Sequence, residues 1–323
     1  MNVVVLGLGS MGKRRIRLMK TSDAAATVYG VDLNEERRRQ VSESFRVETF
    51  SSLEDVLSAH TVDCAFVCTS PLSHSRIIRQ CLAAGLHVFT EINLVADGYR
   101  ENLALAKEKD KVLFLSSTFL YRDEIRYIHK KVRHYGKALN YSYHVGQYLP
   151  DWHPWESYKD FFVGNKRTNG CREILAIELP WIVRVFGSIK TIASLHDRNS
   201  DLEIGYDDNY VIQLVHENGH KGTLHVDVVC PKAVRNLEIY GNHFYASWNG
   251  TPDGLRFFEQ GGMKTVDLHT EYEHLNGYQS TIIENAYRNE IQAFFSAVAK
   301  NDPAAYGLAE DEKVLAWIDE MEA

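Results

Sequence analysis

The first part of the chain alternates short apolar runs with longer amphipathic segments. The apolar runs, each of a length suited to one buried strand, are Val3–Leu6, Thr27–Val31, Val62–Val67, His87–Phe89 and Val112–Leu115. The segments between them place apolar residues at helical spacing, over Lys13–Lys20, Glu35–Ser44, Leu53–Ala59, Ser73–Ala84 and Tyr99–Lys107. Continuous apolar strands separated by helices are typical of a parallel sheet covered on both faces. The pattern therefore predicts a doubly wound α/β domain over residues 1–120.

After Gly136 the pattern changes to longer strands with alternating apolar positions. Tyr210, Ile212 and Leu214 alternate with polar or smaller residues, and Asn218-Gly219 then predicts a hairpin because both residues tolerate positive φ. A helix with apolar residues from Ile174 to Val185 precedes these strands. We predict a second, α+β domain over residues 121–323 with an open, mostly antiparallel sheet. Its closing helices, 282–298 and 308–321, could pack back on the first domain.

Length, composition and charge narrow the class of protein. The chain has 323 residues, of which 45% are hydrophobic and 24% charged, as in ordinary globular proteins. It has no run near the roughly 20 apolar residues of a membrane span, and its apolar start lacks the features of a signal peptide. We therefore expect a cytoplasmic protein without a membrane partner. The net charge of -7 argues against nucleic acid as a partner, and the five cysteines do not suggest a disulfide framework.

A glycine motif follows the first predicted strand directly. Gly7-Leu8-Gly9-Ser10-Met11-Gly12 matches GxGxxG between a strand and a helix, and Asp32 ends the next strand. In dinucleotide-binding domains such glycines let the backbone approach a pyrophosphate, and an acid about 20 residues further on binds the adenosine ribose. Because a carboxylate repels a 2′-phosphate, NAD is favoured over NADP, a preference that the arginines at 37–39 soften. A Rossmann-like domain that binds no dinucleotide is the alternative.

Further segments are similar to the glucose-fructose oxidoreductase, inositol dehydrogenase and rhizopine-catabolism (Gfo/Idh/MocA) family. They are 63–71 with His74, 84–91, 287–294 and 306–308. The resemblance implies a Rossmann domain, a C-terminal sheet that joins subunits into a homodimer or homotetramer, and a reactive cleft between the domains. Members oxidise or reduce a hydroxyl or keto carbon of sugars and polyols with a nicotinamide cofactor. It also implies cofactor contacts from Thr69, Pro71, His74, Glu91 and Asn93.

The resemblance breaks at two positions that handle protons in the family. Glu91-Ile92-Asn93 replaces the usual Glu-Lys-Pro, and Ile177 stands where a histidine is common, four residues after the acid position Glu173. Oxidation of an alcohol needs a base, and such assistance contributes roughly 10²- to 10⁴-fold to the rate. The candidates for this role are Glu173, Glu178, His153 and Tyr121. For the two glutamates, a salt-bridged helix position is an equally good interpretation.

The segment from Gly146 to Trp155 combines aromatic side chains with two prolines. Tyr148, Trp152, His153 and Trp155 form the kind of stiff aromatic surface that stacks on sugar rings, although a purely structural plug fits the same composition. Arg122 could bind a carboxylate or phosphate of the substrate through its two-pronged guanidinium.

Metal and nucleophile chemistry have little support in the sequence. His216 and His220 flank the predicted hairpin turn without a nearby acid or cysteine pair, so we expect solvent-exposed side chains and no metal. The favoured function is an NAD-dependent oxidoreductase acting on a hydroxyl or keto carbon of a sugar, sugar acid or nucleotide sugar. The alternative is a catalytically impaired NAD-binding protein with a binding or regulatory role. The substrate, the reaction direction and the size of the oligomer stay open.

Overall fold

A parallel sheet with strand order β3-β2-β1-β4-β5-β6 forms the centre of the N-terminal half in this computed structural model. Its strands are Asn2–Leu6 (β1), Thr27–Val31 (β2), Glu48–Phe50 (β3), Cys64–Val67 (β4), His87–Thr90 (β5) and Leu113–Leu115 (β6). The order reverses at β1, which pairs with β2 on one side and β4 on the other. In open α/β sheets, ligands bind beyond the carboxyl ends of the strands at such a switch point. The glycine motif follows β1 and therefore lies at this point.

Helices connect these strands and begin at residues that favour a helix start. They are Ser10–Thr21 (α1), Glu35–Phe45 (α2), Leu53–Ala59 (α3), Pro71–Ala83 (α4) and Tyr99–Glu108 (α5). The side chains of Asn34 and Ser52 accept hydrogen bonds from backbone N–H groups in the first turns of α2 and α3. Pro71 occupies the first position of α4, where its missing N–H costs no hydrogen bond.

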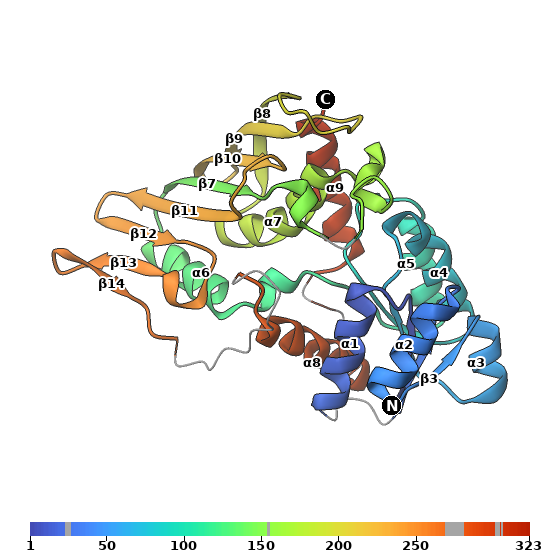
Figure 1. Ribbon diagram of the computed structural model, residues 1–323. Coiled ribbons are helices and arrows are strands. Elements are labelled where there is room, and N and C mark those ends of the chain that lie inside the picture. Colours follow the sequence, from blue (N-terminus) through green and yellow to red (C-terminus); the bar gives the residue numbers. More distant parts are fainter. Residues whose placement is uncertain (23–26, 154–155, 269–280, 301–303, 305) are drawn as a thin grey trace. The chain divides into compact units, whose positions relative to one another are not determined.

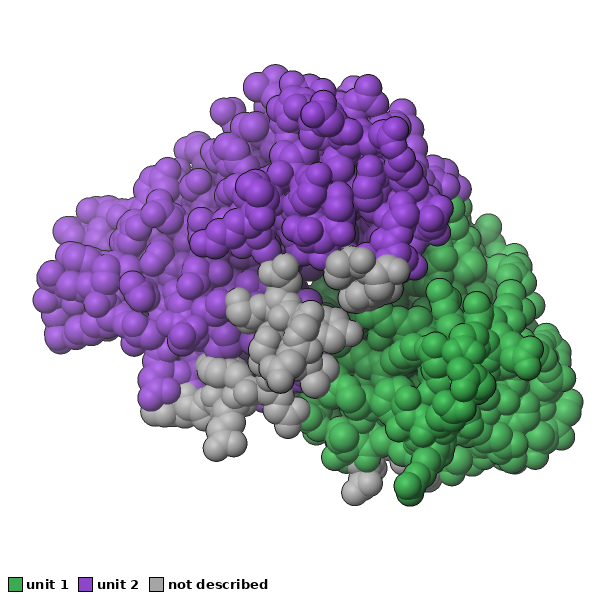
Figure 2. Space-filling model, in the orientation of Figure 1, with its two compact units in different colours: residues 1–118, 287–312 green, residues 119–286, 313–323 purple. Residues whose placement is uncertain are grey.

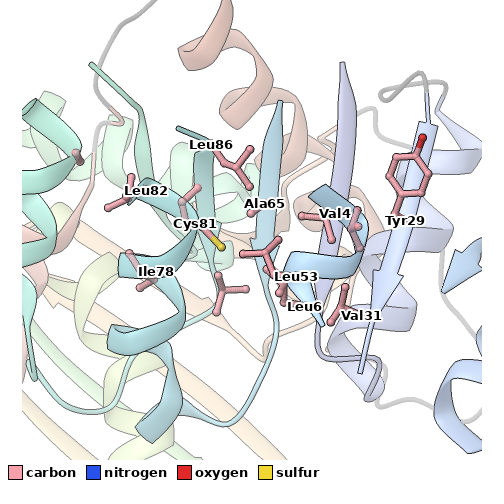
Figure 3. Packing of buried hydrophobic residues seen from close by; sticks show 14 residues of the cluster. Val4, Leu6, Tyr29, Val31, Leu53, Ala65, Ile78, Cys81, Leu82 and Leu86 are labelled. Atoms are coloured by element: carbon pink, nitrogen blue, oxygen red, sulfur yellow. The ribbon is translucent and has the colours of Figure 1, made fainter. Parts of the chain in front are cut away.

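Buried apolar side chains fill both faces of this sheet. On one face Val4, Leu6, Val31 and Ala65 meet Ile78 and other residues of the flanking helices (Figure 3). On the other face the rings of Phe66, Phe89 and Phe114 each contact Phe294 of a late helix, Glu284–Lys300 (α8). The sheet is therefore completed by a segment that lies far away in the sequence.

The C-terminal half contains a second, mostly antiparallel sheet, in the order β14-β13-β12-β11-β7-β10-β9-β8. Its strands are Asn140–Gly146 (β7), Ile189–Asp197 (β8), Asn209–His216 (β9), Lys221–Asp227 (β10), Val234–Gly241 (β11), Phe244–Trp248 (β12), Arg256–Glu259 (β13) and Gly262–Thr265 (β14). Within it, β7 and β10 run parallel, whereas their other neighbours are antiparallel.

Helices Asp123–Tyr135 (α6), Gly170–Phe186 (α7) and Leu308–Met321 (α9) accompany this sheet, and short 3₁₀ turns lie at Thr118–Tyr121, Leu149–Asp151, Phe162–Gly164, Lys166–Thr168 and Pro252–Gly254. One face of the sheet packs against α7 (Figure 1). On this face the ring of Tyr143 contacts Trp181 and that of Tyr141 stacks on Phe186. Side chains alternate between the two faces along each strand, and those on the face opposite α7 are more exposed. Among them are Val211, His144 and Tyr240. Pro180 lies inside α7, which continues through it.

The structure describes the chain except residues 23–26, 154–155, 269–280, 301–303 and 305. The described residues divide into unit 1, with residues 1–118 and 287–312, and unit 2, with residues 119–286 and 313–323 (Figure 2). Unit 1 is therefore built from two separate stretches of chain. Within the described ranges, none of the helices combines the length and the apolar composition that a membrane span requires.

The predicted fold class is confirmed, with one parallel and one mostly antiparallel sheet. The hairpin prediction at Asn218-Gly219 also matches the antiparallel pair β9 and β10, with Gly219 at a φ of 88°. The expected exposure of the two flanking histidines was wrong. His216 is hydrogen-bonded by Tyr141 Oη and the Gly187 carbonyl, and His220 Nδ1 accepts from the Leu139 N–H, so both rings are buried. Burial lowers the pKa of His216 to about 4, which keeps the ring neutral.

Candidate cofactor site and catalytic residues

The glycine loop after β1 shows a different spatial requirement at each glycine. Gly7 has a φ of 93°, and a Cβ there would lie 2.6 Å from the Cys68 carbonyl oxygen. At Gly12 a Cβ would lie 1.9 Å from the Gly7 carbonyl oxygen, whereas at Gly9 it would meet nothing within 4 Å. The first and last glycines therefore close the turn. The middle one leaves open space above the backbone, as close approach of a pyrophosphate requires.

The N-terminus of α1 adjoins this open space. Gly9 is the N-cap, no side chain caps the helix, and its first turn contains no acid. The unpaired N–H groups and the positive end of the helix dipole together favour an anion. Ser10 and Met11, both partly exposed, lie in this first turn. The loop residues thus fit the diphosphate of a dinucleotide.

Asp32 is held beside the glycine loop at the end of β2. Its Oδ2 accepts a hydrogen bond from the Leu8 N–H at 2.7 Å, and its Oδ1 accepts from the Asn34 N–H at 2.8 Å. These two bonds orient the carboxylate and leave lone pairs that could accept ribose hydroxyl groups. Arg37, half-exposed, places a guanidinium nitrogen 3.9 Å from Asp32 Oδ2, and Arg38 donates to the Asp32 carbonyl oxygen.

The corner between β4 and α4 is organised by a buried histidine. His74 Nε2 lies 2.8 Å from the Thr69 carbonyl oxygen, and Nδ1 lies 2.7 Å from the side-chain amide of Asn93. Burial lowers the pKa of His74, which favours the neutral ring, and the single N–H of that ring is donated either to the Thr69 carbonyl oxygen or to Asn93 Oδ1. Thr69 Oγ1 hydrogen-bonds Ser73, while Pro71 begins α4. His74 and Asn93 therefore brace the loop from inside, and Thr69 is the more exposed member of the group.

Glu91 lies at the end of β5 in a buried ion-pair network. Arg15, on α1, donates from Nε and Nη2 to its two carboxylate oxygens at 2.6 and 3.0 Å, and Nη2 also reaches Glu290 of α8 at 2.7 Å. The Arg15 guanidinium further packs over the ring of Phe89. Burial acts to lower the pKa of Arg15, but the two carboxylates outweigh it and raise that pKa. In this structure the Glu91 carboxylate is thus engaged by Arg15.

Glu173 has the environment of a carboxylic acid that keeps its proton. It lies in the first turn of α7, and its Oε2 is buried without a hydrogen-bond partner among the described residues. Burial raises the pKa of Glu173 to about 8. Ile177, one turn later, is the next partly exposed side chain on α7 after Glu173, because the residues between them are buried. Glu173 and Ile177 therefore share one face of the helix.

Glu178, also on α7, has a very different environment. Its Oε2 accepts hydrogen bonds from Tyr143 Oη at 2.8 Å and Trp181 Nε1 at 2.6 Å, and Oε1 accepts from Arg235 Nε at 3.0 Å. The carboxylate is fully buried and paired with a cation. Its lone pairs are occupied by protein donors, which suits a structural role better than proton transfer.

Arg122, the predicted anion-binding residue, is likewise already hydrogen-bonded to other residues of unit 2. It bonds the Glu124 carboxylate and the carbonyl oxygens of Gly250 and Thr281, and it packs over the ring of Trp248. Only 3% of Arg122 is exposed. A substrate anion would have to replace one of these partners. Tyr121, just before it, lies in a 3₁₀ turn with the Arg126 guanidinium 6.0 Å from its ring centre.

The aromatic segment after β7 holds its side chains in separate ways. Tyr148 is exposed, Trp152 donates from Nε1 to the Gln147 carbonyl, and His153 stacks on Phe161 while it hydrogen-bonds Glu156. Trp155 lies outside the described residues. Tyr148 is thus the described ring of this segment with the most surface available for stacking.

Sequence reasoning assigned no role to Arg15 or Glu290. A signal existed for Arg15, because it lies on the buried side of α1 next to Ile16, where an arginine needs a buried acid. The partner itself could not be found from spacing, since Glu290 is 275 residues away. Arg235, the cation that pairs with Glu178, was missed for the same reason.

Comparison with known proteins places this geometry in a wider context. Residues 1–117 match the family described as GFO_IDH_MocA, an oxidoreductase family with an NAD-binding Rossmann fold. Biliverdin reductase A from Homo sapiens is 30% identical over 202 residues, 62% of this chain and 63% of that protein. Myo-inositol 2-dehydrogenase from Thermotoga maritima is 29% identical over 117 residues, 35% of each chain. These alignments cover less than two thirds of each relative.

A solved structure extends the likeness to both sheets. Levoglucosan dehydrogenase in complex with NADH and L-sorbose aligns with a TM-score of 0.79 at 14% identity, covering 99% of this chain and 95% of that one. At this identity the likeness establishes the fold alone. The glycine loop and Asp32 both lie within residues 1–117, the part of the chain that is similar to the NAD-binding Rossmann fold of the Gfo/Idh/MocA oxidoreductase family.

Proposed function

We propose that the protein is an NAD-dependent oxidoreductase that acts on a hydroxyl or keto carbon of a sugar, sugar acid or nucleotide sugar. The observation that carries the proposal is the open backbone at Gly9 beside a fixed Asp32 carboxylate. Levoglucosan dehydrogenase, which shares the fold, is described with NADH and a sugar, L-sorbose. The bound dinucleotide would supply or accept the hydride, and the protein would bind, orient and exchange the proton.

The cofactor preference rests on the surroundings of Asp32. A carboxylate there accepts hydrogen bonds from both ribose hydroxyls and repels a 2′-phosphate, which favours NAD. Arg37 and Arg38 offset part of this repulsion because their guanidinium groups lie beside the same residue. We therefore expect NADH to bind more tightly than NADPH, with a difference that shrinks at higher salt.

The proton role is proposed for Glu173. With a pKa of about 8 its carboxyl group is mostly protonated at neutral pH, so it can donate to the oxygen of a keto group as hydride reaches the carbon. The reverse reaction needs the carboxylate and is therefore favoured at higher pH. Ile92 and Ile177 cannot exchange a proton, and Glu178 is occupied by protein donors.

Turnover with a substrate panel tests this proposal. NADH oxidation is followed at 340 nm with keto sugars, sugar acids and nucleotide sugars, and Glu173→Gln is compared with Glu320→Gln, an exposed acid on α9. We expect Glu173→Gln to lower kcat by roughly 10²- to 10⁴-fold while the Kd of NADH stays within about twofold. Unchanged turnover in Glu173→Gln would remove that residue from the proton role.

A second candidate substrate is a linear tetrapyrrole. It is favoured by the 30% identity to human biliverdin reductase A over 202 residues. It also fits Ile92 and Ile177, because reduction of a carbon–carbon double bond in a conjugated chain involves no hydroxyl group. Biliverdin therefore joins the panel. Turnover with biliverdin and with none of the sugars would favour this candidate, and NADH binding without any turnover would favour a regulatory NAD-binding protein.

We further propose a homodimer or homotetramer that forms through the C-terminal sheet. The face of this sheet opposite α7 carries exposed apolar side chains on several strands, namely Leu195, Val211, Tyr240 and Phe258. The strand register places these residues on the same face. Exposed apolar residues spread over one sheet face are typical of protein–protein interfaces.

A further inference from the structure

Unit 2 brings a histidine, an aspartate and a cysteine together on the sheet face opposite α7. We propose that His144, Asp227 and Cys230 form a binding site for a divalent transition-metal ion of the zinc class. The ligand atoms of these residues lie within 4.8 Å of one another. All three residues belong to unit 2, whereas the glycine loop belongs to unit 1, and the proposal does not depend on the proposed oxidoreductase activity.

The parallel pairing of β7 and β10 creates this cluster. The register places His144 opposite His225 and Gly146 opposite Asp227, so the histidine and the aspartate meet diagonally across two neighbouring strands. His144 Nε2 lies 2.7 Å from Asp227 Oδ2. Because the residues are 83 positions apart in the chain, their spacing could not reveal the cluster.

The turn after β10 fixes the carboxylate and returns the thiol to it. Asp227 Oδ1 accepts hydrogen bonds from the N–H groups of Val229 at 3.0 Å and Cys230 at 2.7 Å. One carboxylate oxygen is therefore held by the backbone, and the other is directed at His144. Orientation of a ligand by such bonds is what metal sites require of their surroundings.

Gly146 provides the space that the carboxylate occupies. A Cβ at this position would lie 2.3 Å from Asp227 Oδ2 and 2.6 Å from Cγ. Any other residue at position 146 would push the Asp227 carboxylate away from its present place. The glycine is thus required by the arrangement of the cluster.

The donor set selects the class of metal. One imidazole nitrogen, one carboxylate oxygen and one thiolate sulfur suit Zn²⁺ or Co²⁺, whereas Mg²⁺ and Ca²⁺ prefer oxygen ligands alone. Cys230 is partly exposed, while the other cysteines, at 64, 68, 81 and 171, are buried. Three protein ligands leave a fourth position that a water molecule would fill. Metal entry would widen the His144–Asp227 separation to about 3.3 Å, the spacing of tetrahedral ligands.

Cobalt titration of the untagged protein tests the site. The protein is treated with a chelator, dialysed and titrated with Co²⁺ under reducing conditions in the absence of dinucleotide. We expect one equivalent of Co²⁺ to produce a thiolate-to-cobalt charge-transfer absorption and intense visible bands of tetrahedral geometry. Zn²⁺ should displace the ion and abolish both signals, and Mg²⁺ should not.

Matched variants separate this site from incidental binding. Cys230→Ser should abolish the charge-transfer absorption, and His144→Gln and Gly146→Ala should each weaken Co²⁺ binding by at least tenfold. Cys64→Ser, a buried cysteine of unit 1, should leave the titration unchanged. The proposal is overturned if the wild-type protein gives no charge-transfer absorption, or if Cys230→Ser and His144→Gln titrate like the wild type. NADH binding, measured separately, reports on the proposed function alone.

Discussion

The space around each glycine of the loop determines whether that glycine is needed for folding or for binding. A Cβ at Gly12 would lie 1.9 Å from the Gly7 carbonyl oxygen, whereas a Cβ at Gly9 would meet nothing within 4 Å. The same substitution, glycine to alanine, therefore has opposite consequences at two positions three residues apart. This contrast separates the contribution of the loop to folding from its contribution to binding.

We predict that Gly9→Ala keeps the stability of the protein but loses affinity for NADH. The new methyl group meets no protein atom, so the free energy of unfolding should change by less than about 0.5 kcal/mol. The methyl group would, however, occupy the space needed by a pyrophosphate, and the Kd of NADH should rise at least tenfold. Urea unfolding and NADH fluorescence titration measure the two effects. Gly12→Ala is the matched comparison and should destabilise the protein by about 2–4 kcal/mol, since its Cβ would overlap a carbonyl oxygen.

A second prediction at this scale concerns the pH dependence of stability at Glu173. Its pKa is about 8 in the folded chain and near 4.5 in the unfolded chain, so the folded state binds the proton more tightly. The stability that this proton contributes is present below pH 4.5 and is lost as the pH rises to 8. Glu173→Gln, which cannot ionise, should therefore gain about 1–3 kcal/mol relative to wild type between pH 5 and pH 9. A difference that stays constant across this range in urea unfolding would contradict the assigned burial.

At the residue scale, local motifs were predictable and distant partners were not. Asp32 could be located because its distance from Gly12 is fixed by one strand–helix–strand unit. The partners of Glu178 could not, because Arg235 reaches it across the fold and the sequence contains no record of that contact. The burial of His216 was missed because a polar ring beside a turn gives the same local pattern whether it is solvated or hydrogen-bonded inside.

At the scale of elements, the Arg15 network joins α1, the end of β5 and α8. Arg15 is fully buried between Glu91 and Glu290, and Glu290 also accepts hydrogen bonds from Ser116 and the Ser117 N–H. Burial raises the pKa of Glu290, and the Arg15 charge opposes that rise. The positive charge of Arg15 thus stabilises two carboxylates, Glu91 and Glu290, in a buried environment that excludes water.

We predict that Arg15→Met destabilises the protein by about 3–5 kcal/mol, because it leaves two buried carboxylates without their cation. Arg39→Met serves as the control. Arg39 pairs with Glu36 and Glu43 on the exposed surface of α2, where solvent screens the charges and ion pairs contribute little to stability. Urea unfolding at pH 7 compares the two variants. Equal losses would mean that the buried network contributes no more than a surface pair.

Most elements were predictable because their apolar spacing is strong. Leu53–Ala59 and Leu308–Met321 were predicted with the bounds that the structure gives. The edge strand Glu48–Phe50 was not predicted, since it has three residues and none of them is fully buried. The parallel pairing of β7 with β10 was also beyond the sequence, because alternation shows which face a side chain takes but not which strand lies alongside.

At the scale of the whole molecule, the open face of the C-terminal sheet should govern assembly. We predict that Leu195→Glu combined with Val211→Glu converts the oligomer to a monomer, since these exposed side chains lie opposite each other on β8 and β9. Light scattering coupled to size-exclusion chromatography measures the mass, and circular dichroism checks the fold. Lys190→Glu, an exposed position near the start of β8, should leave the mass unchanged. A wild-type protein that is already monomeric at micromolar concentration would refute the proposed assembly.

Unit 1 consists of two stretches of chain that are synthesised at different times, so it cannot complete its fold until the second stretch has been made. Phe294 completes the aromatic layer on Phe66, Phe89 and Phe114, yet it leaves the ribosome long after them. At elongation rates of about 5–20 residues per second, the delay is on the order of ten to forty-five seconds. During that interval Phe294 does not cover these three rings, and we expect the exposed aromatic surface to favour binding of the nascent chain by chaperones.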